Sequence, residues 1–263
     1  DLNRWNAASI SQVWSELDPE NSYGRERKKS LLHQLRERWL ELRAEPNSYP
    51  EHPFATTSTP PDPITASREK LGLGYCPVAS DRTRCCNLLT LDAVENCGFD
   101  CSYCSIQSFY HGNQVIFDSG FADKLSRLQL DPNQTYHIGT GQSSDSLMWG
   151  NNQQILDALI QFAGSHPNVI LELKTKSANI THLSRVELPP NIICTWSLNT
   201  RTIIQNEEHA TASLERRLQA ARELADRDVV VGFHFHPIIH YADWRQDYAE
   251  LYRMLQHMFS PSE

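Results

Sequence analysis

Residues 88–104 run LLTLDAVENCGFDCSYC and join a mostly apolar segment to three closely spaced cysteines. The segment 88–95 has the length and composition of a buried strand, so the cysteines directly follow a predicted strand. Cys97, Cys101 and Cys104 stand at C-x3-C-x2-C spacing. Three thiolates at this spacing can hold three irons of a cubane [4Fe–4S] cluster and leave the fourth iron open to a small chelating ligand. The stretch therefore predicts a strand followed by a cofactor loop.

Zinc is the first alternative, because cysteines separated by two residues are also zinc ligands. A structural zinc site normally has a second Cys or His pair at its own regular spacing. No such pair follows Cys104, since His111 and His137 stand alone. Disulfides are typical of short secreted chains, whereas this chain has 263 residues, seven cysteines and no signal-like apolar N-terminal segment. The cluster is the favoured interpretation.

The composition is that of an ordinary globular chain. Its hydrophobic content is 40% and no stretch approaches a membrane span, so we expect no membrane partner. The formal net charge of −8 gives no general attraction for a polyanion, so nucleic-acid binding would require a local basic patch. Free cysteines without an export signal predict a cytoplasmic location.

Two regions are predicted along the chain. Residues 1–63 form an N-terminal helical extension followed by a linker rich in Pro, Ser and Thr. Residues 64–263 alternate between strand and helix patterns, which predicts an α/β fold with a parallel sheet. Strands are predicted near 88–95, 135–141, 168–175, 192–198 and 228–235, and helices near 119–129, 151–165, 211–225 and 242–258.

Polar side chains gather on one face of three predicted strands, since side chains alternate along a strand. They are Glu172, Lys174 and Lys176 on the third strand, Thr195, Ser197 and Asn199 on the fourth, and His234 and His236 on the fifth. The opposite faces are apolar. Buried charges need partners or a function, so this layout predicts a barrel with a polar, ligand-lined mouth. Polar residues satisfied by surface loops are the alternative.

Five segments together resemble the spore photoproduct lyase branch of the radical S-adenosylmethionine (SAM) superfamily. They are the cysteine run 97–104, GTGQSSD at 139–145, ELKTKS at 172–177, WSLN at 196–199 and GFHFHPI at 232–238. The resemblance covers roughly residues 85–258. It implies a partial (β/α)6 TIM-like barrel, a [4Fe–4S] cluster on the three cysteines of the run, and SAM on the open iron.

The resemblance also implies the chemistry and the cofactor contacts. Electron transfer from the cluster cleaves SAM to a 5′-deoxyadenosyl radical, with electrons from a donor such as ferredoxin or flavodoxin. Lys176 can pair with the carboxylate of SAM, and Ser144 and Ser197 can hydrogen-bond its polar groups or ribose. The expected cofactor-binding residues are Gly141, Gln142, Ser144, Asp145, Lys176, Ser197, Asn199 and His236.

Three features depart from the repair enzymes of this branch. Gln142 stands where those enzymes use a cysteine as hydrogen-atom donor, and Ser105 replaces a tyrosine after the third cluster cysteine. The barrel region is also expected to lack the C-terminal, DNA-contacting part. Damaged DNA is therefore one expected substrate, and a peptide, a nucleotide or a small metabolite is the alternative. A non-catalytic Fe–S or zinc-binding module is a second alternative.

The candidate catalytic residues are Cys76, Cys85, Cys86 and Tyr103. The three cysteines precede the cluster strand and can ligate an auxiliary Fe–S cluster with Cys194, supply the hydrogen atom that Gln142 cannot, or be inert buried thiols. Tyr103 lies beside the last cluster cysteine. Its ring can cover the cluster or an adenine, or simply pack in the loop.

Overall fold

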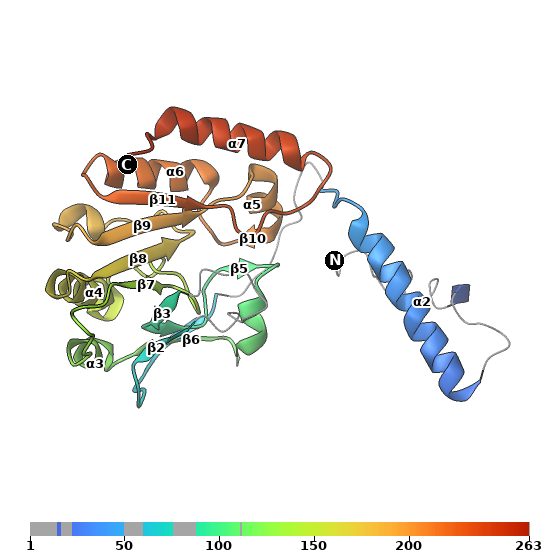
Figure 1. Cartoon of the computed structure of the whole chain (residues 1–263), viewed down its shortest axis with the longest axis horizontal. Helices are drawn as coiled ribbons and strands as arrows, with labels where there is room; N and C mark the ends of the chain where they lie inside the picture. Colours follow the sequence, from blue (N-terminus) through green and yellow to red (C-terminus); the bar gives the residue numbers. More distant parts are fainter. Residues whose placement is uncertain (1–14, 17–22, 50–59, 76–87, 111, 263) are drawn as a thin grey trace. The chain divides into compact units, whose positions relative to one another are not determined.

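The computed structural model describes residues 15–16, 23–49, 60–75, 88–110 and 112–262. These residues belong to two compact units. The smaller unit contains helix α2 (Gly24–Ala44) and residues 240–243 (Figure 1). The larger unit contains the elements from strand β1 to helix α7, apart from residues 240–243.

Helix α2 lies within the region that was predicted as an N-terminal helical extension. Its leucine Leu31 is buried, whereas Leu32 and Trp39 are exposed. In the same unit, the rings of Tyr49 and Tyr241 lie edge to face with their centres 5.7 Å apart. The predicted boundary after residue 63 falls inside strand β1, which belongs to the larger unit.

A six-stranded sheet is the base of the larger unit. Its strands are β2 (Gly72–Tyr75), β3 (Leu89–Asp92), β7 (Tyr136–Thr140), β8 (Val169–Thr175), β9 (Ile192–Ser197) and β11 (Val230–His234). They lie in the order β11-β9-β8-β7-β3-β2, with β2 antiparallel to β3 and every other pair parallel (Figure 1). The predicted parallel α/β fold is therefore confirmed. The predicted partial barrel is not confirmed, because the described residues form no closed sheet: the edge strands β2 and β11 do not pair.

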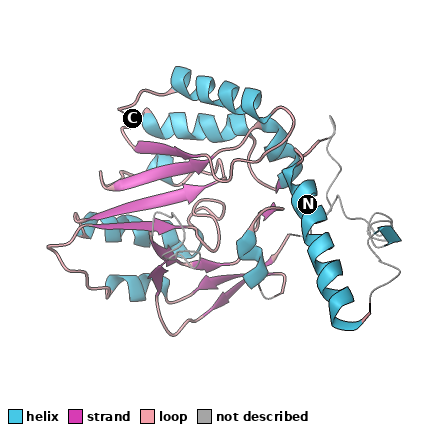
Figure 2. Ribbon diagram, turned by 45° about the vertical axis from the view of Figure 1, so that its right-hand side comes forward, coloured by secondary structure: helices cyan, strands magenta, loops and turns pink. Residues whose placement is uncertain are grey.

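Helices and short 3-10 turns connect the strands (Figure 2). The helices are α3 (Phe121–Ser126), α4 (Ile155–Ser165), α5 (Arg201–Glu207), α6 (Leu214–Ala225) and α7 (Trp244–Met258), and the turns are η2 (Ser105–Phe109), η3 (Asn152–Gln154) and η4 (Leu183–Arg185). The four predicted helices of this region are confirmed, with shorter ends. Helix α5 was not predicted, since seven residues are too few for a clear helical periodicity.

The core lies between the main sheet and its helices. Leu171 and Leu173 of β8 and Trp196 of β9 have no exposed surface, and these strands contact α4 and α6 respectively. Glu172 and Thr195 alternate with these residues and therefore face the other side of the sheet. The predicted division into an apolar outer face and a polar inner face is confirmed for these strands.

Two small sheets were not predicted from the sequence. One has the order β1-β6-β4, from β1 (Asp62–Ala66), β6 (Gln114–Asp118) and β4 (Val94–Glu95); the other pairs β5 (Asp100–Cys101) with β10 (Glu208–His209). The predicted strand 88–95 thus divides into β3 and β4, which belong to different sheets and are separated by a bend at Ala93. Among the described residues, no helix combines the length and apolar character needed to cross a bilayer.

Candidate functional site

One cavity collects the predicted site residues at the carboxyl ends of the parallel strands. Its volume is about 280 Å³. It is lined by the predicted residues Cys97, Cys101, Tyr103, Cys104, Gly141, Gln142, Ser144, Asp145, Lys176, Ser197 and His236. Asn199, which was predicted to bind the cofactor, does not line it, and neither do Glu172, Thr195 and His234 of the predicted polar face. Residues far apart in the sequence therefore meet as the strand-end argument predicts.

The three cluster cysteines are free thiols on one wall of this cavity. Burial raises the pKa of Cys101 to about 12, although the positive charge of Lys176 lowers it in part. Burial, and to a smaller extent the negative charge of Asp145, also raises the pKa of Cys97. Thiolates at these buried positions would need a nearby positive charge, which iron bound here would supply. Within the described part of the chain, no three His, Cys, Asp or Glu side chains converge on one metal ion. A cubane cluster does not require such convergence, because each thiolate binds a different iron.

The cysteine loop is held by backbone pairing. Cys101 in β5 pairs with Glu208 in β10, and the amide of Ser102 donates to the carbonyl of Glu207 at 2.9 Å. The amide of Cys104 donates to the carbonyl of Cys101 at 3.0 Å, which closes a turn between these two cysteines. The positions of the cysteines thus depend on the segment after α5, more than a hundred residues later in the sequence.

Gly141 allows the turn that brings the loop after β7 to the cavity. Its φ is +77°, and an added Cβ would lie 2.6 Å from Ser146 Oγ and 3.0 Å from the Lys174 carbonyl oxygen. Both the conformation and the space exclude a larger side chain without a shift of the neighbours. Gly141 is therefore required by the backbone conformation of the GTGQSSD segment, whatever its role toward a cofactor.

Asp145 fastens this loop to the end of β8. Its carboxylate accepts hydrogen bonds from the amides of Leu147, Met148 and Lys176 and from the Thr175 hydroxyl, at 2.7–3.0 Å. Burial raises the pKa of Asp145, and the four hydrogen bonds oppose that shift. Asp145 was predicted to bind the cofactor. The structure shows that both of its oxygens bond to protein groups and that it positions Lys176.

Ser144, Lys176 and His236 are among the polar residues that line the cavity. The Ser144 hydroxyl is buried and has no hydrogen-bond partner within the described structure. The Lys176 ammonium lies 5.8 Å from the centre of the Tyr103 ring. Burial and the charges of Lys174 and Lys176 lower the pKa of His236, so its ring is neutral at pH 7. A buried hydroxyl without a partner is costly, which favours a bound ligand at this point.

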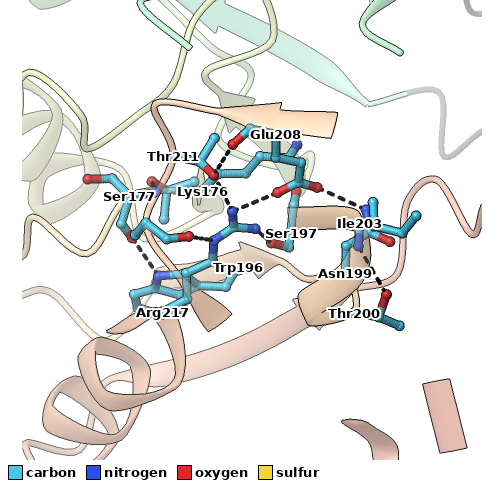
Figure 3. A network of polar contacts seen from close by, with 12 residues as sticks. Lys176, Ser177, Trp196, Ser197, Asn199, Thr200, Ile203, Glu208, Thr211 and Arg217 are labelled. Carbon is cyan, nitrogen blue, oxygen red and sulfur yellow. Dashed lines mark hydrogen bonds and ion pairs between the residues drawn. The ribbon is translucent and has the colours of Figure 1, made fainter. Parts of the chain in front are cut away.

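Sequence reasoning missed a buried ion pair behind the cavity, between Glu208 and Arg217 (Figure 3). Arg217 Nη2 lies 2.6 Å from Glu208 Oε2, and both side chains are completely buried. Tyr103 and Asn199 donate to the other oxygen of Glu208. The side-chain oxygen Oδ1 of Asn199 accepts from the Tyr248 hydroxyl, so both ends of this amide bond to protein groups, and Asn199 does not line the cavity. No local sequence pattern predicts this network, because its side chains come together only in the folded chain.

A second polar group lies on the inner face of the sheet, at the level of Glu172. Its carboxylate accepts from Thr195 at 2.6 Å and contacts ring nitrogens of His234 at 2.7 Å and His137 at 3.0 Å. Burial raises the pKa of Glu172, but these hydrogen bonds and charges outweigh burial and lower it to about 2. These residues do not line the cavity.

The second cysteine group is only partly described. Cys76, Cys85 and Cys86 lie outside the described residues, so their predicted roles stay predictions. Cys194 is completely buried and shares a face of β9 with Trp196, on the helix-covered side of the sheet. It takes no part in the cavity.

A family model for spore photoproduct lyase matches residues 94–263. The chain belongs to the spore photoproduct lyase family. This family consists of radical SAM lyases, so the predicted resemblance is confirmed. The match covers the cysteine loop and the strands that line the cavity.

Two curated relatives carry the name spore photoproduct lyase. The one from Clostridium acetobutylicum is 28% identical over 169 residues, which are 61% of this chain and 49% of the relative. The one from Geobacillus sp. is 27% identical over 164 residues, which are 60% of this chain and 48% of the relative. The chain thus spans about half the length of the relatives it matches.

Solved structures of spore photoproduct lyase have the same fold. A complex with dinucleoside spore photoproduct has a TM-score of 0.66 at 19% identity, over 87% of this chain and 70% of that chain. A double variant with bound AdoMet and dinucleoside spore photoproduct has a TM-score of 0.65 at 20% identity, with the same coverage. At these identities the likeness concerns the fold.

Proposed function

We propose that this chain is a radical SAM enzyme in which Cys97, Cys101 and Cys104 hold a [4Fe–4S] cluster beside a SAM-binding cavity. One observation carries the proposal: the three thiols share a cavity with Ser144, Lys176 and Ser197, which come from three different strand ends. When bound, the cluster supplies the electron that cleaves SAM and yields the 5′-deoxyadenosyl radical.

The residues of the chain bind and orient the cofactor. The Lys176 ammonium is a cation in a partly buried site and pairs with the carboxylate of SAM. The Ser144 hydroxyl gains the partner that it lacks, and Ser197 hydrogen-bonds the ribose or the methionyl group. The neutral His236 ring can donate or accept without adding charge beside the sulfonium.

A direct test is SAM cleavage by the full chain. The protein is reconstituted anaerobically with iron and sulfide, reduced with dithionite, and given SAM, and 5′-deoxyadenosine is quantified. Cys101→Ala should abolish the product, whereas Cys194→Ala, which removes a thiol outside the cavity, should retain it. Full iron loading without 5′-deoxyadenosine would overturn the proposal.

The first substrate to test is dinucleoside spore photoproduct, because solved relatives bind it. Gln142 lines the cavity at the position where the resemblance places a hydrogen-donor cysteine, and an amide does not donate a hydrogen atom as a thiol does. We therefore propose that the wild-type chain cleaves SAM but restores the two thymidines poorly, and that Gln142→Cys improves this step. Efficient repair by the wild type would show that Gln142 does not limit it.

A further inference from the structure

The Glu208–Arg217 ion pair is buried deeply enough to need an explanation. The exposed fractions are 2% for Glu208 and 0% for Arg217. Removing two charges from water costs several kcal/mol, and an apolar pair of similar volume is often as stable. Stability alone therefore does not account for a charged pair at this place.

Arg217 connects the pair to the end of β9. Its guanidinium donates to the carbonyl oxygens of Ala212 and Ser197, both at 2.8 Å, and to the Thr211 hydroxyl at 2.6 Å (Figure 3). Ser197 also lines the cavity. The rigid guanidinium fork thus fixes the backbone of a proposed SAM contact.

Glu208 connects the pair to the cysteine loop. Its backbone pairs with Cys101, and its Oε1 accepts from the Tyr103 hydroxyl and from Asn199 Nδ2, the latter at 2.9 Å. One residue therefore holds both the second cluster cysteine and the tyrosine two residues later. Burial alone would raise the pKa of Glu208, but Glu208 lies close enough to Arg217 and to the Lys176 ammonium for their charges to lower it.

Tyr103 extends this connection to Lys176. The ring of Tyr103 lies beneath the Lys176 ammonium, 5.8 Å from the ring centre. Because the hydroxyl is fixed by Glu208, the ring face has a defined orientation toward the ammonium. Lys176, Ser197 and Cys101 are thus linked through one buried carboxylate.

We propose that Glu208, held by Arg217, is a positioning residue that fixes the Cys101–Tyr103 part of the cysteine loop relative to the SAM-binding ends of β8 and β9. This inference rests on the proposed function. It assigns the pair to SAM binding and orientation, and not to cluster assembly, because the two side chains bond to Tyr103 and to the Ser197 carbonyl oxygen and not to a cysteine thiol.

The experiment follows SAM binding spectroscopically in the reconstituted full chain. The dithionite-reduced cluster is titrated with SAM, and the change in its electron paramagnetic resonance signal is plotted against SAM concentration. The key variant, Glu208→Met/Arg217→Met, removes both charges together, so that no unpaired charge is left in the core. The control, Glu215→Gln, removes a carboxylate from the exposed pair with Arg201.

The double variant should fold and bind the wild-type amount of iron. Its half-maximal SAM concentration should rise on the order of tenfold, since a small misplacement of binding groups is costly. Glu215→Gln should match the wild type. A folded double variant with an unchanged SAM titration would overturn the inference and leave the proposed function intact.

A second variant covers the case in which the double variant does not fold. Tyr103→Phe removes only the hydroxyl that bonds to Glu208 and keeps the ring. It should also weaken SAM binding at unchanged iron content, and an unchanged titration would overturn the inference. If the wild-type signal does not respond to SAM at all, the proposed function fails, and this inference with it.

Discussion

Glu172 shows how a charged side chain is kept on the inner face of the sheet. Its exposed fraction is 4%, yet Thr195, His137 and His234 surround the carboxylate with hydrogen-bonding groups. The pKa of Glu172 is about 2, below its ordinary value of 4.5, so its ionised form stabilises the folded chain. This stabilisation is complete at a pH above 4.5, the ordinary pKa, and is lost as the pH falls toward about 2, the pKa in the folded chain.

We therefore expect Glu172→Gln to lower the free energy of unfolding at pH 7 by about 2 kcal/mol, because charge-assisted hydrogen bonds are lost. The difference from the wild type should shrink as the pH falls from 4.5 toward 2. Urea unfolding of both proteins at neutral and acidic pH measures it. A difference that is independent of pH would contradict this role.

Gly141 offers a test of steric fit next to the cavity. We expect Gly141→Ala to lower the free energy of unfolding by about 2 kcal/mol more than Gly112→Ala. Both glycines have similar positive φ values, +77° and +76°, but an added Cβ meets neighbours only at Gly141. The two variants thus share the backbone strain and differ in crowding. Equal losses in chemical denaturation would refute the steric explanation.

The side chains divide into those that local sequence can identify and those that it cannot. Cys97, Cys101 and Cys104 follow from their spacing, and Lys176 follows from strand alternation. Glu208 does not, because it lies in a polar segment after a seven-residue helix, and its partner in the cysteine loop, Tyr103, is 105 residues away. Hydrogen bonds across long sequence separations decide its role, and no local pattern encodes them.

The short strands are the elements that were not predicted from the sequence. β5 and β10 have two residues each, so neither has a detectable period of two. Their pairing nevertheless fixes the cysteine loop. The longer β8 and β9 were predicted correctly, because alternating apolar and polar residues mark their two faces.

Helix α6 carries Arg217 and begins with a capping serine. The Ser213 hydroxyl accepts from the Arg216 amide at 3.4 Å. We expect Ser213→Ala to lower the free energy of unfolding by about 1 kcal/mol, and Ser213→Gly to lower it by only a few tenths. Thermal or urea unfolding of the two variants measures the difference. If alanine and glycine are equivalent, the cap is not important for α6.

The larger unit supplies the whole candidate site. All residues that line the cavity lie between positions 97 and 237, and residues of that range belong to this unit. The alternation of strands and helices predicted the parallel sheet, but it could not predict whether the two edge strands of the described sheet, β2 and β11, meet. Closure depends on whether the edge strands find partners, and periodicity holds no information about that.

The central claim is that the three cysteines hold a cluster with an iron open to SAM. The most direct measurement is an iron count combined with electron paramagnetic resonance of the reconstituted, reduced full chain, with and without SAM. We predict about four irons per chain and a cluster signal that changes when SAM is added. A chain that binds a single zinc ion, or a cluster signal that does not respond to SAM, would contradict the claim.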